Sequence, residues 1–228
     1  MDRLRKDYRQ LTPELVLRAY AAGIFPMAEG RSERTIFWVD PERRGIIPLD
    51  TSFHVPKRLR RTVRNQRFEV RVDSNFDQVI RACAATAARR QETWINDEII
   101  RVYSELHASG FAHSVECFED GSFAGGLYGI ALGGAFFGES MISRGRDASK
   151  VALVHLVARL RLGGFTLLDS QFITAHLSRF GAVEISRRDY LERLSDAFAV
   201  TAEFYRDPPA GALAGALEGV LQSSSQTS

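Results

Sequence analysis

The sequence predicts an α/β fold with a mixed β-sheet, preceded by a small N-terminal unit. Three strand-like segments follow one another over residues 112–140, joined by tight turns at an Asp-Gly and a Gly-Gly pair. A helical segment at 147–164 separates them from a buried apolar strand at 165–172. Because a strand that returns after one helix must lie beside an earlier strand, the sheet should contain parallel and antiparallel pairs.

Residues 1–50 are expected to form the small N-terminal domain. Its helix begins after Thr12, which can cap it, has Pro13 in its first turn and ends at Gly23. The stretch 23–50 is rich in Gly and Pro but also carries Phe and Trp side chains. It is too apolar for a linker and too interrupted for a long helix, so it should pack against the larger domain.

The larger domain is expected over residues 51–205 and begins with a basic helix, 54–67. Val55, Leu59 and Val63 form an apolar seam at helical spacing. The basic face of this helix consists of Lys57, Arg60, Arg61 and Arg64. A charge run is commonly only a solvated face. Here six cations occur without one acid, in a chain with 30 cations and 28 acids, which favours phosphate contact.

The remaining elements follow from periodicity and capping residues. We expect a strand at 68–72, a helix at 73–88 capped by Asp73 or Ser74, a helix at 94–110 capped by Asn96, and helices at 174–181 and 187–198. Residues 206–228 have low complexity and are expected to form a flexible tail.

Composition restricts the function classes. A net charge of +2 and 45% hydrophobic residues are typical of a globular protein. No apolar run is long enough to span a membrane, no signal peptide is recognisable, and Cys83 and Cys117 suit reduced core residues, so a cytoplasmic protein is expected. The usual zinc, P-loop and dinucleotide-binding motifs are missing from the sequence.

A carboxylate, Glu139, ends an otherwise apolar strand, and burying a charge is costly unless it is paired. One interpretation is an ion pair with Arg144, and the other is a functional site. Strand alternation puts Asp169 and Gln171 on one face of the strand at 165–172, where they could join Glu139. Alternatively, Asp169 or Gln171 caps the backbone of the next turn, and the residues alone leave both interpretations open.

Six strings occur in order between residues 12 and 194: "AYAAGIFPM", "TWINDEIIRVYSELHASGFAHSVE", "GGLYGIALGGAFFGESMISR", "ASKVAL", "LLDSQF" and "HLSRFGAVEISRRDYL". Together they resemble the leucyl/phenylalanyl-tRNA–protein transferases of the bacterial N-end rule pathway. The resemblance implies a GNAT-like acyltransferase domain behind a small N-terminal domain. It implies transfer of Leu, Phe and in some cases Met from aminoacyl-tRNA to proteins beginning with Lys or Arg. No ATP, metal or organic cofactor is implied, and a monomer is expected.

The same resemblance implies roles for individual residues. Asp169 and Gln171 would orient the amine and help to deprotonate it, and Glu139 would hold the acceptor's cationic amine or side chain. Trp94 would stack on the terminal adenine, and the basic face would meet acceptor-stem phosphates. The other substrate-binding residues would be Tyr103, Met27, which replaces a Trp common in the family, and the donor pocket of Leu127, Phe136, Met141, Leu153, Leu156 and Leu168.

Two other functions remain open at this point. A GNAT-type N-acyltransferase that uses acyl-CoA would need a glycine-rich pyrophosphate loop before the helix at 147–164, and "SRGRDASKVAL" lacks the R/Q-x-x-G-x-G/A pattern. A nucleic-acid-binding module without catalysis would leave Glu139, Asp169 and Gln171 unexplained.

Overall fold

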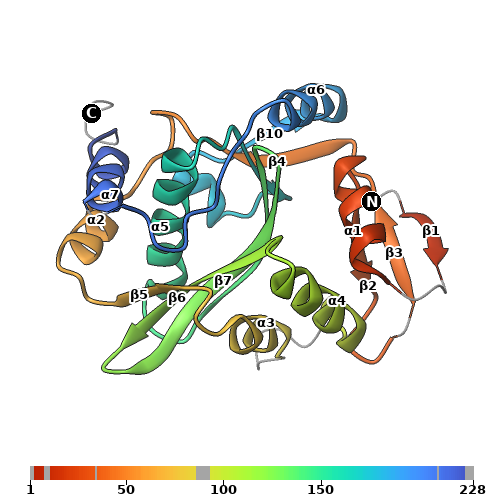
Figure 1. The fold of residues 1–228 in the computed structure, drawn as a ribbon, viewed down its shortest axis with the longest axis horizontal. Coiled ribbons are helices and arrows are strands. Elements are labelled where there is room, and N and C mark those ends of the chain that lie inside the picture. The colour runs from red at the N-terminus through yellow and green to blue at the C-terminus, as the bar shows by residue number, and fades with distance from the viewer. Residues whose placement is uncertain (1–2, 8–10, 34, 86–92, 210, 224–228) are drawn as a thin grey trace.

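The computed structural model describes residues 3–7, 11–33, 35–85, 93–209 and 211–223. Its centre is a seven-stranded sheet with helices on both faces (Figure 1). In sheet order the strands are β10 (Val183–Ser186), β4 (Arg43–Ile47), β9 (Leu167–Gln171), β8 (Ala135–Ser143), β7 (Ser122–Leu132), β6 (Ala112–Glu119) and β5 (Glu69–Val72). All neighbours are antiparallel except β8 and β9, which are parallel, so the prediction of a mixed sheet is confirmed.

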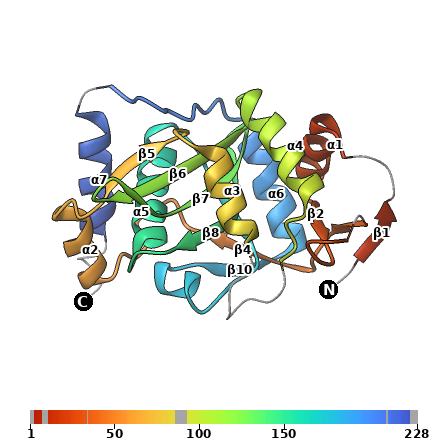
Figure 2. The same ribbon diagram turned by 90° about the horizontal axis from the view of Figure 1, so that it is seen from below.

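The helices divide between the two faces of this sheet. One apolar core lies under α1 (Pro13–Ala21), α3 (Phe76–Ala84), α4 (Asp97–Ala108) and α6 (Arg187–Phe198). The other lies under α2 (Lys57–Arg64), α5 (Ala148–Leu162) and α7 (Ala212–Ser223), with the short 3-10 helix Leu177–Phe180 nearby. Figure 2 shows α7 beside α2 and α5 at one end of the molecule and α1 at the other end.

The N-terminal part forms its own antiparallel sheet, with the order β1 (Arg3–Asp7), β3 (Ile36–Val39) and β2 (Phe25–Ala28). Thr12 caps α1 as expected, because its Oγ1 accepts a hydrogen bond from the Leu15 amide at 3.2 Å. However, β4 pairs with β9 and β10 in the large sheet. The boundary between the two units therefore falls before Arg43, earlier than the expected residue 50.

Two of the predicted helix caps have different outcomes. Asn96 caps α4, accepting from the Ile99 amide at 2.9 Å. The helix predicted at 73–88 begins later than expected, because Asn75, rather than Asp73 or Ser74, is its cap. The Asp73 carboxylate instead accepts a hydrogen bond from the backbone amide of a strand, β6. Residues 86–88 of this prediction lie outside the described residues.

A β-bulge interrupts the pairing of β7 and β8 at Glu139. Tyr128 faces Ser140 and Gly129 faces Gly138, so Glu139 is the extra residue on β8. A bulge redirects the side chains that follow it. The bulge therefore gives Glu139 a direction that regular strand alternation would not.

The bulge also explains how two residues five apart come to share one face of β8. Phe136 and Met141 both pack in the core under α5, whereas regular alternation would place them on opposite faces. Gly129 allows the close approach of the neighbouring strand, since a Cβ there would collide with the Phe137 carbonyl and the Phe136 ring. The glycines in β7 thus serve strand packing.

The parallel pairing of β8 and β9 is short. It joins Ala135 to Leu167, Phe136 to Leu168 and Phe137 to Asp169, and then ends. Beyond this point β8 remains paired with β7, and β9 with β4. The two strands separate between these partners, and their carboxyl ends leave space for a cavity.

The basic helix α2 has the predicted orientation. Leu59 and Val63 are buried in the core under α5. Lys57 and Arg61 are exposed. Arg64 is also exposed but forms an ion pair with Glu218 of α7, at 2.8 Å between Nη2 and Oε1. Arg64 is therefore already engaged within the protein.

The flexible tail expected over residues 206–228 is wrong for its central part, because Ala212–Ser223 form the helix α7. Residues 210 and 224–228 of this prediction lie outside the described residues. Leu213, Leu217, Val220 and Leu221 recur at helical spacing, and the last two are 0% and 2% exposed. This apolar stripe packs on α5. The low-complexity composition concealed a regular amphipathic pattern.

We predict that Leu221→Ala lowers the free energy of unfolding by about 2–4 kcal/mol, because it removes a buried side chain from the contact of α7 with α5. The matched control is Gln222→Ala at the exposed neighbour, which should change it by less than about 0.5 kcal/mol. Urea denaturation measures both. Equal stability of the two variants would show that α7 does not dock in solution.

Candidate active site

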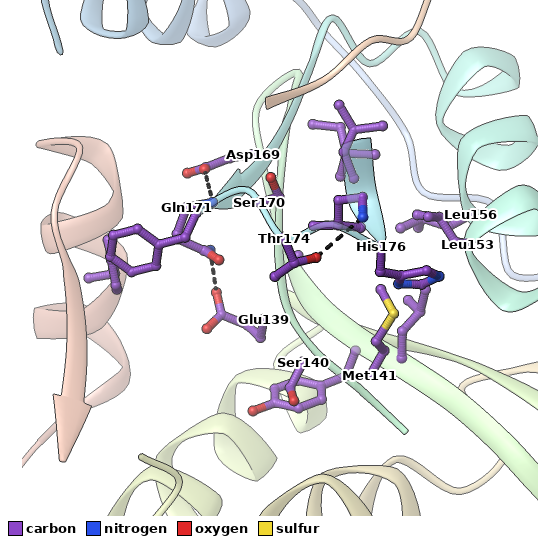
Figure 3. A pocket seen from close by; sticks show the side chains of 18 of the residues that line it. Glu139, Ser140, Met141, Leu153, Leu156, Asp169, Ser170, Gln171, Thr174 and His176 are labelled. Carbon is purple, nitrogen blue, oxygen red and sulfur yellow. Dashed lines mark hydrogen bonds between the residues drawn. The ribbon is translucent and has the colours of Figure 1, made fainter. Parts of the chain in front are cut away.

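A cavity of about 510 Å³ lies where β8 and β9 separate. Figure 3 shows that its two ends differ in chemistry. Glu139 and Gln171 lie at one end, with the side-chain amide of Gln171 directed at the carboxylate. Met141, Leu153 and Leu156 lie at the other end. The cavity thus joins an apolar compartment to a carboxylate and an amide.

Glu139 is held by hydroxyl and amide donors. The Tyr20 hydroxyl donates to it at 2.6 Å, and the Tyr103 hydroxyl and Gln171 Nε2 each approach its carboxylate at 3.4 Å. The two tyrosine oxygens are 2.6 Å apart, which links α1 and α4 at this point. The ion pair with Arg144 is not formed, since that guanidinium lies over the ring of Phe123 instead.

Burial raises the pKa of Glu139 to about 8, and the charge of Asp169 adds to this effect, while the hydrogen bond from Tyr20 and the charge of Arg44 oppose it. Burial, and then the charge of Glu139, raise the pKa of Tyr20 and of Tyr103 well above their ordinary range. Both hydroxyls therefore remain protonated donors. Glu139 exchanges its proton near the pH at which an α-amino group does.

Asp169 is fully buried, and both of its oxygens already accept hydrogen bonds. Arg44 donates from Nε at 3.0 and 3.1 Å and from Nη2 at 2.6 Å. Tyr190 donates its hydroxyl at 2.8 Å, and the Gln171 backbone amide donates at 2.7 Å. The capping interpretation of Asp169 therefore describes its actual contact. This carboxylate fixes the backbone that carries Gln171.

Arg44 connects Asp169 to the N-terminal domain. Its Nη1 donates to the Gly23 carbonyl at 2.9 Å, and its guanidinium lies 4.6 and 4.5 Å from the ring centres of Phe25 and Tyr190. Burial alone would lower the pKa of Arg44, but the Asp169 carboxylate outweighs this and holds it above its usual range. Arg44 is therefore charged where it meets the Asp169 carboxylate.

Gln171 leaves regular strand geometry. Its φ of 56° lies in the left-handed region, which is uncommon for a residue other than Gly, Asn or Asp. The hydrogen bond from its amide to Asp169 holds this conformation. As a result its side chain reaches Glu139 across the gap between β9 and β8 (Figure 3). Local strain of this kind is often found where a side chain must be aimed.

The structure brings most of the predicted substrate-binding residues to this cavity. The lining includes Met27, Trp94, Leu127, Met141, Leu153, Leu156 and Leu168. Phe136 differs, since it is fully buried behind the lining and stacks on Phe204 at 5.7 Å. Tyr103 reaches the site through Glu139. Tyr20, Arg44 and Tyr190 were not foreseen, because no local pattern marks them.

An apolar cavity that ends at a titratable carboxylate suits an acyltransferase, which must hold an acyl group and accept one proton from the attacking amine. Comparison with known proteins identifies the kind of acyltransferase. Residues 46–195 match the family model of the leucyl/phenylalanyl-tRNA protein transferases, and residues 9–42 match the model of their N-terminal domain. The chain belongs to this family and is an aminoacyltransferase.

The similarity extends over nearly the whole chain. A leucyl/phenylalanyl-tRNA–protein transferase of Paramagnetospirillum magneticum is 62% identical over 199 residues, which cover 87% of this chain and 95% of that protein. The transferase of Caulobacter vibrioides is 59% identical over 194 residues, covering 85% and 89%. That of Maricaulis maris is 54% identical over 211 residues, covering 92% and 97%.

A solved C-terminal domain of a putative lysylphosphatidylglycerol synthetase from Agrobacterium fabrum aligns with 93% of this chain and 71% of that one, at 14% identity and a TM-score of 0.36. That score is too low to assign the fold. Within the described residues, no helix could span a membrane, and no group of three or more His, Cys, Asp or Glu side chains could hold a metal ion.

We predict that Arg44→Met lowers the free energy of unfolding by about 3–5 kcal/mol, because it leaves the buried Asp169 carboxylate without its counter-charge. Adding Asp169→Leu should restore part of this loss, since the uncompensated charge is then gone. Urea denaturation of the wild type, both single variants and the double variant gives the coupling energy. Strictly additive losses would mean that the pair does not stabilise the ionised state of Asp169.

Proposed function

We propose that this protein transfers Leu or Phe, and Met as a third donor, from aminoacyl-tRNA to the α-amino group of proteins that begin with Lys or Arg. The modification would mark these proteins for N-end rule degradation. One observation carries the proposal: the apolar end of the cavity opens directly onto Glu139 and Gln171. A donor side chain in the apolar end would thus present its ester to a group able to take a proton. Family membership supports the same activity.

The chemistry requires little more than positioning and one proton acceptor. The ester of the donor is already activated, so the protein needs no nucleophile of its own. The amine nitrogen forms a bond to the ester carbonyl carbon and passes a proton to the ionised Glu139. The bond from that carbon to the ribose oxygen then breaks, and the oxygen takes up a proton. Glu139, with a pKa of about 8, suits both the acceptance and the return of that proton.

Gln171 would orient the amine in this scheme. Its Nε2 is directed at Glu139, which leaves its side-chain oxygen to accept a hydrogen bond from the amine. Asp169 would act as a positioning residue, because its oxygens are occupied by Arg44, Tyr190 and the backbone of Gln171. The proton-accepting role expected for the Asp169–Gln171 pair thus passes to Glu139.

The acceptor and the rest of the donor would bind around this centre. Of the two carboxylates at the cavity, Glu139 would attract the cationic amine of an acceptor, since Asp169 already pairs with Arg44. Trp94 and Met27 lie at the same cavity and would contact the terminal adenosine, with Met27 supplying a flexible apolar surface in place of an aromatic ring. The exposed cations of α2, Lys57 and Arg61, would meet the acceptor stem, together with Arg60. We place the protein in the cytoplasm as a monomer.

An acyltransferase that uses acyl-CoA is the alternative for the same cavity. The family model and the transferases compared above do not favour it, since they are named for an aminoacyl-tRNA donor. The direct test offers purified protein a peptide beginning with Arg and either Phe-tRNA or an acyl-CoA. Transfer from the tRNA alone is the expected result.

We predict that the rate of transfer depends on two ionisations, that of the acceptor amine and that of Glu139. Below about pH 7.5 both the acceptor amine and Glu139 must lose a proton, so log kcat/KM for the peptide should rise with a slope approaching 2. In Glu139→Gln the slope should fall to 1 and the rate by about 10²-fold or more. Single-turnover measurements with saturating Phe-tRNA test this. A higher peptide KM with unchanged kcat and slope would instead make Glu139 only a binding group.

We also predict that Leu and Phe esters are used far better than Ile or Val esters. The described lining at the apolar end consists mainly of Met141 and leucines, beside the neutral His176 ring, and no Lys, Arg or carboxylate side chain lies there to select a polar side chain. Leu and Phe branch at the γ carbon, whereas Val and Ile branch at the β carbon, next to the ester that must be aligned. Apolar fit alone gives about 1–3 kcal/mol, and misalignment of the carbonyl adds to this.

Competition between charged tRNAs that share one body and differ only in the amino acid measures this selectivity. A variant that shortens the wall, Met141→Ala, should lose discrimination between Leu and Ile more than it loses total transfer. Equal transfer of Ile and Leu by the wild type would contradict the pocket model.

A further inference from the structure

A second hollow lies beside the cavity, at the N-terminal end of α5. Its lining comes from α2, from the loop between β8 and α5, from α5 itself and from the segment before the 3-10 helix. Four of its side chains are cationic: Arg58, Arg144, Arg146 and Lys150. Asp147 is its only acidic lining residue among those described. We call this feature the basic hollow.

The position of Asp147 leaves the basic hollow strongly positive. Asp147 adopts a φ of 71°, and its side chain makes no capping hydrogen bond to α5. The carboxylate binds Lys150 Nζ at 2.6 Å and lies 3.5 Å from Arg58 Nη2. One acid therefore positions two cations, while Arg144 and Arg146 remain exposed. Three positive charges are left in excess.

The first amides of α5 contribute little to this feature. The Ala148 and Lys150 amides donate to backbone carbonyls, and the Ser149 amide donates to Ser143 Oγ at 3.1 Å. Any anion held here would therefore be bound by side-chain cations rather than by the end of the helix. Exposed Arg side chains in a concave site are typical of phosphate recognition.

One residue joins the basic hollow to the cavity. His176 lines both of them, and Figure 3 shows it near Met141 at the apolar end. Its Nε2 is buried and has no hydrogen-bond partner within the described part of the chain. Burial, with Lys150 and Arg179 nearby, lowers its pKa, so the ring is neutral at pH 7 and can donate one hydrogen bond. A ligand that passes between the two spaces would pass beside this ring.

The second half of β8 connects the cavity to the basic hollow, and its length gives the distance between them. Five residues lead from Glu139 to Arg144, and an extended strand of this length spans about 17 Å. Residues 139–142 along it are partly exposed. An amino acid and its adenosine occupy the cavity in the proposed function. The nucleotides that precede this adenosine must then leave it, and the exposed edge of β8 leads them to the cations.

We propose that the basic hollow binds the backbone phosphates of the single-stranded acceptor end of the donor tRNA, next to the terminal adenosine. The inference rests on the proposed function and extends it. The basic face of α2 then meets phosphates farther along the acceptor stem. The charged part of the donor is held outside the apolar cavity, and the uncharged ester lies inside it.

Three donors of increasing length separate these contacts: Phe-adenosine without a phosphodiester, the Phe ester of the trinucleotide CCA, and Phe-tRNA. The test variant is Arg144→Gln with Arg146→Gln, both exposed and outside the apolar cores. We expect KM to rise about tenfold for the CCA and tRNA donors, and to stay within about twofold for Phe-adenosine. The slope of log KM against log salt should fall by about 0.7 for each lost phosphate contact.

Two further variants sharpen the comparison. Arg188→Gln on α6 removes another exposed cation, 83% exposed, on the face of the sheet opposite α5, and should change the use of none of the three donors. Lys57→Gln with Arg61→Gln on α2 should weaken Phe-tRNA while leaving the CCA donor nearly unchanged. This difference assigns the hollow to the single-stranded end and α2 to the stem.

The proposal fails if the Arg144/Arg146 variant uses the CCA donor as well as the wild type does. It also fails if the variant loses Phe-adenosine equally, which would indicate a disturbed cavity. Transfer from an acyl-CoA that depends on these arginines would assign the hollow to a pyrophosphate instead. A wild type that uses no aminoacyl donor at all would overturn the proposed function itself.

Discussion

The candidate active site depends on the early end of one strand pairing, that of β8 with β9. β8 and β9 share only three residue pairs, the last of them Phe137 with Asp169. A longer pairing would close the sheet and fill the space that now holds the cavity. Two devices keep the strands apart: the bulge at Glu139 on β8, and the left-handed backbone of Gln171 on β9. Each device also aims its own side chain at the other. The same local departures from strand geometry therefore create the cavity and supply its polar groups.

The buried pair of Arg44 and Asp169 maintains this geometry. A buried ion pair adds little net stability, because desolvation offsets most of the attraction. The role of this ion pair is to fix the positions of the segments that it connects. Arg44 joins β4 to the end of α1 through Gly23, and Asp169 joins β9 to α6 through Tyr190. The N-terminal domain, the large sheet and α6 thus meet at one carboxylate. That carboxylate in turn fixes the amide of Gln171. The polar end of the cavity is therefore coupled to the contact between the two parts of the chain.

The sequence predicted features that depend on local periodicity and capping. The mixed sheet, α4, α5 and the apolar seam of α2 are confirmed because their patterns are complete within one segment. The convergence of Glu139 with Gln171 also followed from chain order. The partners that define their chemistry could not be derived in this way. Arg44 lies 125 residues from Asp169, and Tyr20 lies 119 from Glu139, so no periodic pattern connects them. The bulge and the positive φ are set by packing, and a hydrophobic pattern does not encode either.

Two carboxylates in one site differ because their neighbours differ. Asp169 faces a guanidinium and is saturated with donors, whereas Glu139 faces hydroxyls and an amide, and burial raises its pKa to about 8. The first can only hold geometry, and the second can exchange a proton. The phosphate charges of the donor tRNA separate binding strength from donor selectivity. Contacts with tRNA phosphates strengthen binding of every aminoacyl-tRNA by the same amount, because the phosphates do not vary with the amino acid. Such uniform binding lowers KM but cannot select a donor. In the proposed function, selection between amino acids would therefore arise in the apolar end of the cavity, where the side chain and the alignment of its ester are sensed together.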